Sequence, residues 1–440
     1  MRFTPWATRL ALTLSLSATA LLTACGGGGN DGDSNTQVRL LNATRSYAQL
    51  DLSVDDKAVN TKVAYASVGE YGSVKSDGPA VRVLTSDVGT SITATQPSLA
   101  GGSNYTFISY GFAGAVRMTT LQEAETAPDA NKAKLLVLNL APDAGALDIY
   151  VTTATDPLDT ATALSTNLAG GSGSGYIQIN SGTFRVRVTG YNKRTDLRLD
   201  IPAMTLDSAS VNTLILTSSD GGVLVNGISL VQKGAVKNFL NTQSRVRTVA
   251  ALTNNATVGT TLNGQAMLTG AISPLISEYV TTASGASTLS AMVNGSPVTF
   301  AAPTLAAGGD YTLMVWGSAA APQLAVLSDD NRLPTVNGNV KVRLVNGLTG
   351  LTSSLNVDFS ALASNVGAGL ASTSASVSST ASSQVDVTVP TSSTPIYTNS
   401  ALALPANSVW TFFAVPNTAT VGTTTSPVPG MSALPKRERP

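Results

Sequence analysis

Alternating apolar and polar positions are the clearest pattern along this chain. The segment Phe184–Val188 places three apolar side chains on one side and two arginines on the other, and Val385–Val389 repeats the alternation. This period of two is typical of half-buried antiparallel strands. Turn-forming residues recur about every 8–12 residues, and no amphipathic helix stands out. The pattern predicts an all-β chain.

A second pattern repeats four times. A leucine is followed six places later by an anchor residue, then by threonine and an apolar strand; the anchors are Tyr105, Asn212, Tyr311 and Trp410. This regular spacing predicts tandem modules. About 100 residues are enough for each module to bury its own core.

We therefore expect four tandem immunoglobulin-like antiparallel β-sandwich modules. The last module includes a Ser/Thr/Ala-rich stretch, 360–383, that we expect to be an irregular insertion, and 433–440 is expected to be a frayed tail. The modules are expected to follow one another as an extended string. Their predicted boundaries are 37–122, 134–240, 244–333 and 339–432.

The leucine-to-tyrosine element resembles the tyrosine corner of immunoglobulin-like sandwiches, in which a tyrosine hydroxyl bonds the backbone upstream. Tyr105 and Tyr311 fit this role. Asn212 and Trp410 cannot bond in the same way, so their corners must be built differently. The alternative is that Tyr105, Tyr311 and Trp410 form a platform on which a sugar stacks.

Polar residues recur at the starts of the modules as well. Asp51, Asp148 and Asn356 occupy one predicted strand in modules 1, 2 and 4, whereas module 3 is degenerate at its start. A recurrent polar residue either marks a site or bonds a neighbouring turn. Both interpretations remain open at this stage.

Composition excludes several kinds of catalysis. There is no histidine, and Cys25 is the only cysteine, so neither Ser-His-Asp nor Cys-His chemistry is available. No metal or cofactor site is predicted. No pair of carboxylates stands out for hydrolysis, and Asp55 and Asp56 fit a hairpin turn. Basic and acidic residues are balanced at 26 each, which disfavours nucleic acid as a partner.

The N-terminus indicates where the protein works. Residues 1–24 combine Arg2 and Arg9 with an apolar run that is too short to span a bilayer,. Leu22, Thr23 and Ala24 precede Cys25 in an arrangement that resembles the lipobox of bacterial lipoproteins. That resemblance implies cleavage before Cys25, its lipidation with fatty acyl chains such as palmitate, and a membrane partner. By analogy, Gly26 after the cysteine favours the outer membrane, and 25–36 form a Gly-rich tether.

Module 2 resembles the bacterial family known as domain of unknown function 4397. The resemblance rests on the turn Ala141–Ala144, the strand Leu147–Val151 and the strand Gly182–Val188. It covers 134–233 well and the rest of the chain weakly. It implies an immunoglobulin-like sandwich in an exported, often lipidated protein, and it brings no activity and no site residues.

Two functions follow as hypotheses. The first is a non-enzymatic envelope lipoprotein that displays its modules for scaffolding, adhesion or contact with envelope components. The second is a glycan-binding surface lipoprotein, in which the basic hairpin of module 2 meets phosphates or uronates. Alternatively, the charges of this hairpin form a solvated strand face. The candidate ligand-binding residues are Arg185, Arg187, Lys193, Arg194 and Arg198.

Overall fold

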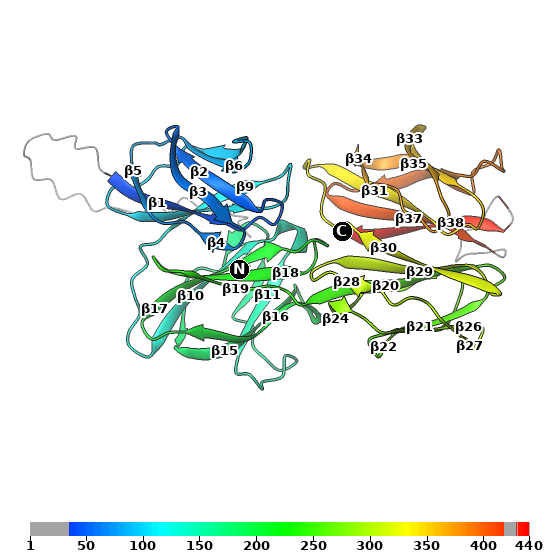
Figure 1. Ribbon diagram of the computed structural model, residues 1–440, viewed down its shortest axis with the longest axis horizontal. Coiled ribbons are helices and arrows are strands. Elements are labelled where there is room, and N and C mark those ends of the chain that lie inside the picture. The colour runs from blue at the N-terminus through cyan, green and yellow to red at the C-terminus, as the bar shows by residue number, and fades with distance from the viewer. Residues whose placement is uncertain (1–34, 418–427, 429, 440) are drawn as a thin grey trace, which may run out of the picture.

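Four β-sandwiches form the protein, and they pack together as two pairs (Figure 1). The computed structural model describes residues 35–417, 428 and 430–439. These residues form strands and one short 3-10 helix, η1 (Pro142–Ala144), which confirms the all-β prediction. No helix in these ranges is long and apolar enough to cross a bilayer. The predicted signal peptide, Cys25 and nearly all of the predicted tether lie outside the described residues.

Each module consists of two sheets, which we call the inner and the outer sheet. The inner sheet contains the first strand of the module and a late strand that runs parallel to it. Every other strand pair within these sheets is antiparallel in the part of the chain that the structure describes. This parallel pair is an addition to the antiparallel sandwich that the sequence predicts.

Modules 1 and 2 form the first pair. Their inner sheets have the orders β4-β1-β8-β9, with β5 also on β1, and β13-β10-β17-β18-β19, with β14 also on β10. Their outer sheets have the orders β3-β2-β6-β7 and β12-β11-β15-β16. The strands of module 1 are β1 (Asn35–Asn42), β2 (Gln49–Val54), β3 (Lys57–Ala64), β4 (Ser67–Val68), β5 (Gly72–Lys75), β6 (Val81–Thr85), β7 (Ser91–Thr95), β8 (Asn104–Tyr110) and β9 (Arg117–Gln122). Those of module 2 are β10 (Lys132–Leu140), β11 (Leu147–Thr152), β12 (Ser165–Leu168), β13 (Ser172–Gly173), β14 (Ile177–Asn180), β15 (Gly182–Gly190), β16 (Lys193–Leu206), β17 (Ser210–Ser218), β18 (Val225–Val231) and β19 (Val236–Phe239).

Modules 3 and 4 form the second pair. Their inner sheets are β23-β20-β29-β30, with β24 also on β20, and β34-β31-β37-β38. Their outer sheets are β22-β21-β26-β27 and β33-β32-β35-β36, and module 3 adds the small sheet β25-β28. The strands of module 3 are β20 (Gln243–Leu252), β21 (Thr257–Leu262), β22 (Gln265–Ile272), β23 (Leu275–Ile276), β24 (Val280–Ala283), β25 (Gly285–Ala286), β26 (Leu289–Val293), β27 (Ser296–Val298), β28 (Thr304–Leu305), β29 (Asp310–Ser318) and β30 (Ala321–Asp329). Those of module 4 are β31 (Asn339–Asn346), β32 (Ser353–Val357), β33 (Ser360–Val366), β34 (Ala375–Ser378), β35 (Thr380–Thr388), β36 (Tyr397–Leu404), β37 (Ser408–Pro416) and β38 (Met431–Arg439).

The core of each sandwich lies between its inner and outer sheet. In module 1, Leu40 on β1 and Phe107 on β8 face Leu50 and Leu52 on β2, and all four are fully buried. Similar clusters fill the other modules. The alternation seen in the sequence supplies these inward-facing residues.

The opposite face of each inner sheet is buried too, because the inner sheets of paired modules pack against each other. Leu41 and Ile108 of module 1 share one cluster with Ile215 and Ile228 of module 2. Modules 3 and 4 share a smaller cluster, centred on Val249, Ala251, Met314, Val345, Phe413 and Val415. Each pair is therefore a four-layer stack. In the sequence, a strand that is covered on both faces therefore appears as a continuous apolar run and not as alternating apolar and polar residues.

The two pairs are joined to each other through turns and linkers. The backbone N–H of Leu333, between modules 3 and 4, donates to Asp143 of module 2 at 2.7 Å. The guanidinium of Arg332 lies 4.7 Å from the ring centroid of Phe112 in module 1. The described modules therefore form a two-by-two block (Figure 1), and the expectation of an extended string is wrong.

Strands make up most of two segments for which the sequence predicts irregular structure. The stretch 360–383 forms β33, β34 and the first part of β35. In β34, partly buried residues alternate with exposed ones. The sequence conceals this period because Ala, Ser and Thr differ little in hydrophobicity. The supposed tail 433–440 belongs almost entirely to β38, which pairs with β37 along its length. Its Glu438 is held by a buried ion pair with Arg247, so the charges do not mark a frayed end.

Candidate functional site

The basic residues expected to bind a ligand lie on the hairpin of β15 and β16. Arg185 is tied to Asp200 by two hydrogen bonds, of 2.8 and 2.5 Å. Arg187 is buried, and it donates to the hydroxyl of Thr152 and the carbonyl of Asp156. Both arginines of β15 therefore stabilise module 2 itself.

The basic residues of β16 are mostly engaged as well. Arg198 pairs with Asp196 at 2.9 and 2.5 Å, and its remaining nitrogen donates to backbone carbonyls. Lys193 is exposed and forms no ion pair among the described residues, although its charge contributes to the lowered pKa of Asp196. Arg194 donates to three carbonyls of one loop, those of Leu158, Asp159 and Ala161. The structure brings the five residues together, and ligand binding by this hairpin stays a prediction.

The anchor residues have a structural role. The hydroxyl of Tyr105 accepts the backbone N–H of Ala100 at 2.8 Å, and Tyr311 accepts that of Ala306 at 2.9 Å. These contacts form the expected tyrosine corners of modules 1 and 3. Modules 2 and 4 build this corner through a serine instead. In module 2, the side-chain amide of Asn212 donates to the hydroxyl of Ser210, which donates to the backbone carbonyl of Asp207. In module 4, the indole N–H of Trp410 donates to the hydroxyl of Ser408, which donates to the backbone carbonyl of Pro405.

The recurrent aspartates bond neighbouring turns. Asp51 accepts the backbone N–H of Lys62 at 2.7 Å, and Asp148 accepts those of Asn167 and Asn192 at 2.9 and 3.0 Å. All three donors have positive φ angles, which non-glycine residues seldom adopt without local hydrogen bonding. These carboxylates therefore hold strained turns and are not free to act as a site.

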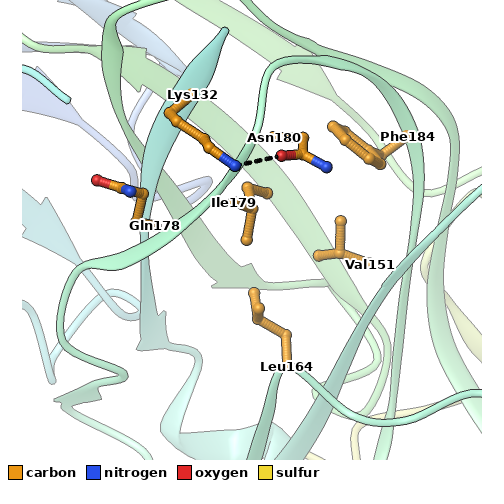
Figure 2. Close-up of a pocket in the computed structure, with 7 residues that line it drawn as sticks. All are labelled: Lys132, Val151, Leu164, Gln178, Ile179, Asn180 and Phe184. Atoms are coloured by element: carbon orange, nitrogen blue, oxygen red, sulfur yellow. Dashed lines mark hydrogen bonds between the residues drawn. The ribbon is translucent and has the colours of Figure 1, made fainter. Parts of the chain in front are cut away.

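A small notch opens at one end of module 2 (Figure 2). It has a volume of about 370 Å³ and includes Val151, Ile179 and Phe184. The amino group of Lys132 at its rim donates to Asn180 at 2.7 Å. Its one charged group is already bonded, and its surface is a mixture of polar and apolar side chains.

A larger cleft lies where module 2 meets modules 3 and 4. Its volume is about 1090 Å³, slightly above the range of roughly 300–1,000 Å³ that is typical of small-molecule sites. Module 2 contributes the turn around Tyr191 and the strand that carries Arg198, module 3 contributes Arg245 and Tyr279, and module 4 contributes the end of β38. The cleft exists only because the two pairs are docked.

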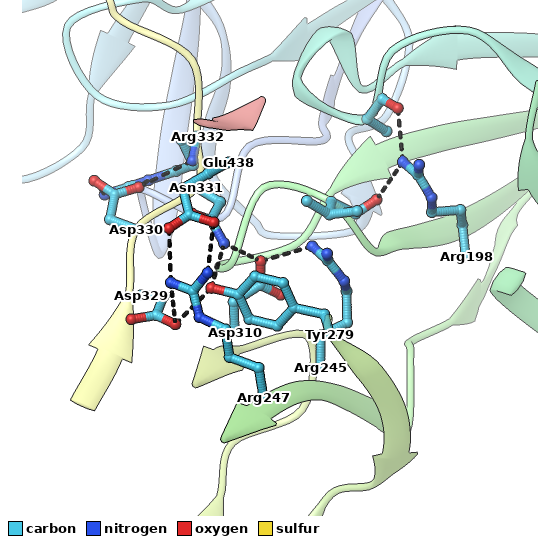
Figure 3. Close-up of polar contacts among 12 residues, drawn as sticks. Arg198, Arg245, Arg247, Tyr279, Asp310, Asp329, Asp330, Asn331, Arg332 and Glu438 are labelled. Atoms are coloured by element: carbon cyan, nitrogen blue, oxygen red, sulfur yellow. Dashed lines mark hydrogen bonds and ion pairs between the residues drawn. The ribbon is translucent and has the colours of Figure 1, made fainter. Parts of the chain in front are cut away.

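Behind this cleft, buried charges connect modules 3 and 4 (Figure 3). Arg247 is fully buried and forms two hydrogen bonds of 2.7 Å with Glu438 of module 4. Arg343 of module 4 pairs in return with Asp329 of module 3. Each module thus neutralises an arginine of its partner. The phenol of Tyr279 donates to Asp329 at 2.6 Å and completes the cluster.

Modules 1 and 2 contain a simpler version of this cluster. Arg39 forms an ion pair of 3.0 Å with Glu123, and Tyr71 donates to the same carboxylate at 2.6 Å. Module 2 contributes only backbone groups: the carbonyl of Gly234 accepts from Arg39, and the N–H of Lys233 donates to Glu123.

Burial changes the titration of Asp310 at the edge of the module 3–4 cluster. Its carboxylate accepts from Arg245 at 2.8 Å and from Asn331 at 2.7 Å. Desolvation nevertheless raises its pKa to about 6, with a further contribution from the negative charge of Asp329. One of its oxygens has no hydrogen-bond partner.

Sequence reasoning missed the buried arginines, although their signal was present. Arg39, Arg247 and Arg343 interrupt apolar first strands, and each lies opposite the threonine of its module's corner element. Each arginine donates from Nε to that threonine. Three of the four threonines of the repeated pattern, those of modules 1, 3 and 4, therefore position the charges that face the partner module.

Comparison with known families agrees with this architecture. The family model for the domain of unknown function DUF4397 matches residues 36–150 and 244–352, just over half of the 440 residues. The chain belongs to the DUF4397 family. The first match covers module 1 and continues through β10 into β11 of module 2, and the second covers module 3 and the first strand of module 4, β31. Of the stretch 134–233 that the sequence singled out, they include only 134–150.

Solved structures show a much weaker likeness to this DUF4397 protein. A carbohydrate-binding module (CBMbc, family CBM26) of Eubacterium rectale Amy13K, solved with maltoheptaose, is 10% identical, with 46% of this chain and 97% of that one covered and a TM-score of 0.16. A candidate cell adhesion protein of Bacteroides ovatus is 13% identical, with coverages of 46% and 96% and a TM-score of 0.20. Another from Parabacteroides distasonis is 10% identical, with coverages of 71% and 99% and a TM-score of 0.17. At these TM-scores the likeness carries no argument about function. A search of the curated proteins found no match.

Proposed function

We propose that the protein is a non-enzymatic lipoprotein of the bacterial cell envelope that presents a rigid four-module block for scaffolding, adhesion or contact with envelope components. The observation that carries this proposal is the use of the polar residues. The recurrent aspartates hold turns, and the buried arginines join modules. Their arrangement serves architecture rather than bond-making chemistry.

The anchor in this proposal rests on Cys25. The lipobox-like sequence before it supports lipidation, and Gly26 supports placement in the outer membrane. Several acyl chains would hold the protein firmly at a bilayer, since one chain alone anchors only weakly. The Gly-rich stretch that follows the cysteine would then link the four-module block to the membrane.

Labelling with an alkyne analogue of palmitate tests the anchor. We expect the native chain to incorporate the label and to sediment with outer membranes. The Cys25→Ala variant should be unlabelled and released from the membrane. A native chain that remains unlabelled and soluble would contradict the proposal. A Lys57→Ala variant, changed at an exposed site on module 1, serves as the matched control.

Glycan binding through module 2 is the second candidate function. The exposed Lys193, which forms no ion pair among the described residues, supports it. A glycan array of the Cys25→Ala chain tests it with and without Lys193→Ala. Loss of salt-sensitive binding in the Lys193 variant, but not in Lys57→Ala, would support this function. Absence of any binding would contradict it.

A further inference from the structure

The cleft between the pairs has more positive than negative charge available to a ligand. Its carboxylates are all engaged: Asp196 with Arg198, Asp200 with Arg185, Glu278 with Lys436 and Glu438 with Arg247. Three of its cations have no carboxylate within ion-pair distance among the described residues. These cations are Lys193, Arg437 and Arg439.

Arg439 is the most unusual of the three. Only 8% of its surface is exposed, and its Nε is buried without a hydrogen-bond partner. Burial, and then the neighbouring positive charges of Arg198 and Arg245, lower its pKa to about 10, against the opposing effect of the more distant carboxylates of Asp143 and Asp310. A buried guanidinium is costly when no carboxylate pairs with it directly, and none of the described residues does so here, so this position favours an incoming oxyanion.

The neighbouring groups strengthen this preference. Arg198 and Arg245 approach the cleft from modules 2 and 3 (Figure 3). Arg198 and Arg245 are each paired with a carboxylate, whereas no carboxylate of the described residues forms an ion pair with Arg439. A guanidinium matches the geometry of carboxylate and phosphate groups through paired hydrogen bonds.

The size and the remaining walls of the cleft indicate a ligand larger than a single ion. Tyr191 presents an exposed ring, 44% accessible, to the cleft. Several further wall residues have hydrogen-bonding side chains with no protein partner among the described residues, namely Thr195, Gln243, Gln265 and Thr281. Amide and hydroxyl groups beside an open ring suit a molecule that carries many hydroxyls.

We propose that this cleft binds an acidic saccharide, with Arg439 meeting a uronate carboxylate or a sugar phosphate and Lys193 and Arg437 meeting further anionic groups. The proposal rests on the second candidate function and places the ligand in the cleft instead of on the outer face of the hairpin. Because three modules form the walls, binding requires the intact block.

Calorimetric titration of the full mature chain carrying Cys25→Ala tests this site. The probes are trigalacturonate, glucose 6-phosphate, inorganic phosphate and the neutral sugar maltotriose. We expect one or both acidic sugars to bind and maltotriose not to bind. Arg439→Gln should weaken the binding about tenfold or more, as expected for loss of a charge-assisted hydrogen bond.

A stability measurement separates a ligand-binding role of Arg439 from a structural one. Without ligand, Arg439→Gln should raise the melting temperature, because it removes an uncompensated buried charge. A residue that merely stabilised the fold would lower it when replaced. If Arg439→Gln binds the acidic sugar more weakly than the parent chain and melts at a higher temperature, the result supports the site. A lower melting temperature for this variant overturns it.

Matched variants distinguish a failure of the proposed cleft site from a failure of glycan binding as a function. Arg185→Gln changes the same hairpin outside the cleft lining. Binding that is lost in Arg185→Gln but kept in Arg439→Gln would overturn the cleft site and leave glycan binding intact. Binding to neither acidic sugar would overturn both. Binding of inorganic phosphate with no affinity for either acidic sugar would overturn the assignment to saccharides.

Discussion

The interface between modules 1 and 2 and the interface between modules 3 and 4 use equivalent sheets but different side chains. Opposite the corner threonine, modules 1, 3 and 4 carry an arginine, whereas module 2 carries Leu136. Leu136 joins the broad apolar cluster between modules 1 and 2. Modules 3 and 4 have a smaller apolar cluster, and two arginines there exchange carboxylates across the interface.

This difference shows how a repeat can vary its assembly without changing its fold. With leucine at the shared position, the interface depends mainly on apolar burial, which is not directional. With arginine there, Arg247 requires Glu438 and Arg343 requires Asp329. An unpaired charge buried at such a contact is strongly unfavourable. The second interface is therefore the more selective for its own partner.

The largest effect is expected from breaking the exchanged ion pairs. Arg247→Ala should lower the free energy of unfolding by about 3–5 kcal/mol, because Glu438 and Asp329 would lose a buried partner. Chemical denaturation followed by tryptophan fluorescence measures this loss. A cost below about 1 kcal/mol would mean that water reaches these carboxylates and that the interface does not depend on the arginine.

The apolar interface should respond to the loss of side-chain volume instead. Ile215→Ala, in the cluster between modules 1 and 2, should cost about 2–5 kcal/mol through lost burial and a new cavity. Leu240→Ala is the control, because Leu240 is 51% exposed and should contribute little. Equal costs for the two variants would argue against tight packing of the inner sheets.

The interface of modules 3 and 4 should also be the one that senses pH. Asp310 has a pKa of about 6 when folded and an ordinary value near 3.9 when unfolded. The folded chain therefore retains a proton that the unfolded chain releases, and stability falls as pH rises between about 4 and 6. Asp310→Asn removes this dependence. The free energy of unfolding of the Asp310→Asn variant, minus that of the native chain, should therefore increase by about 3 kcal/mol from pH 4 to pH 7.

Urea denaturation of both proteins at several pH values measures that difference. A pH-independent difference would contradict the assignment. Asp51→Asn is the matched control, since it changes an aspartate of module 1 that lies far from the module 3–4 cluster.

The smallest effects are expected at the exposed ion pairs that cross each interface. Arg45–Asp220 links modules 1 and 2, and Lys436–Glu278 links modules 4 and 3. Exposed pairs contribute about 0–1 kcal/mol because water screens them. Arg45→Gln and Lys436→Gln should therefore both have small effects in denaturation experiments. A large loss for either would show that exposed charges, and not buried ones, hold the pairs together.

Much of the fold could be predicted from local patterns. Alternation indicated the strands, and the spacing of Tyr105 and Tyr311 indicated the corners, because these features depend on neighbours only a few residues away. The pairing of modules could not be predicted in this way. Arg247 and Glu438 are 191 residues apart, and a continuous apolar strand does not reveal which sheet covers its second face.

The candidate site shows the same division between local and long-range information. The sequence placed Arg185, Arg187, Lys193, Arg194 and Arg198 on one hairpin, as observed. It could not show that local carboxylates and carbonyls engage four of them. Nor could it place Arg439 in the same cleft as Arg198, because that depends on β38 returning to the boundary between the two pairs.

Small-angle X-ray scattering of the lipid-free Cys25→Ala chain tests the two-by-two arrangement most directly. A compact block of about 400 residues should have a radius of gyration of about 22 Å. Four modules placed end to end, each with a radius of gyration of about 13 Å, would give roughly 40 Å or more. A radius of gyration near 22 Å supports paired modules whose inner sheets are covered on both faces. A value of roughly 40 Å or more would contradict this arrangement.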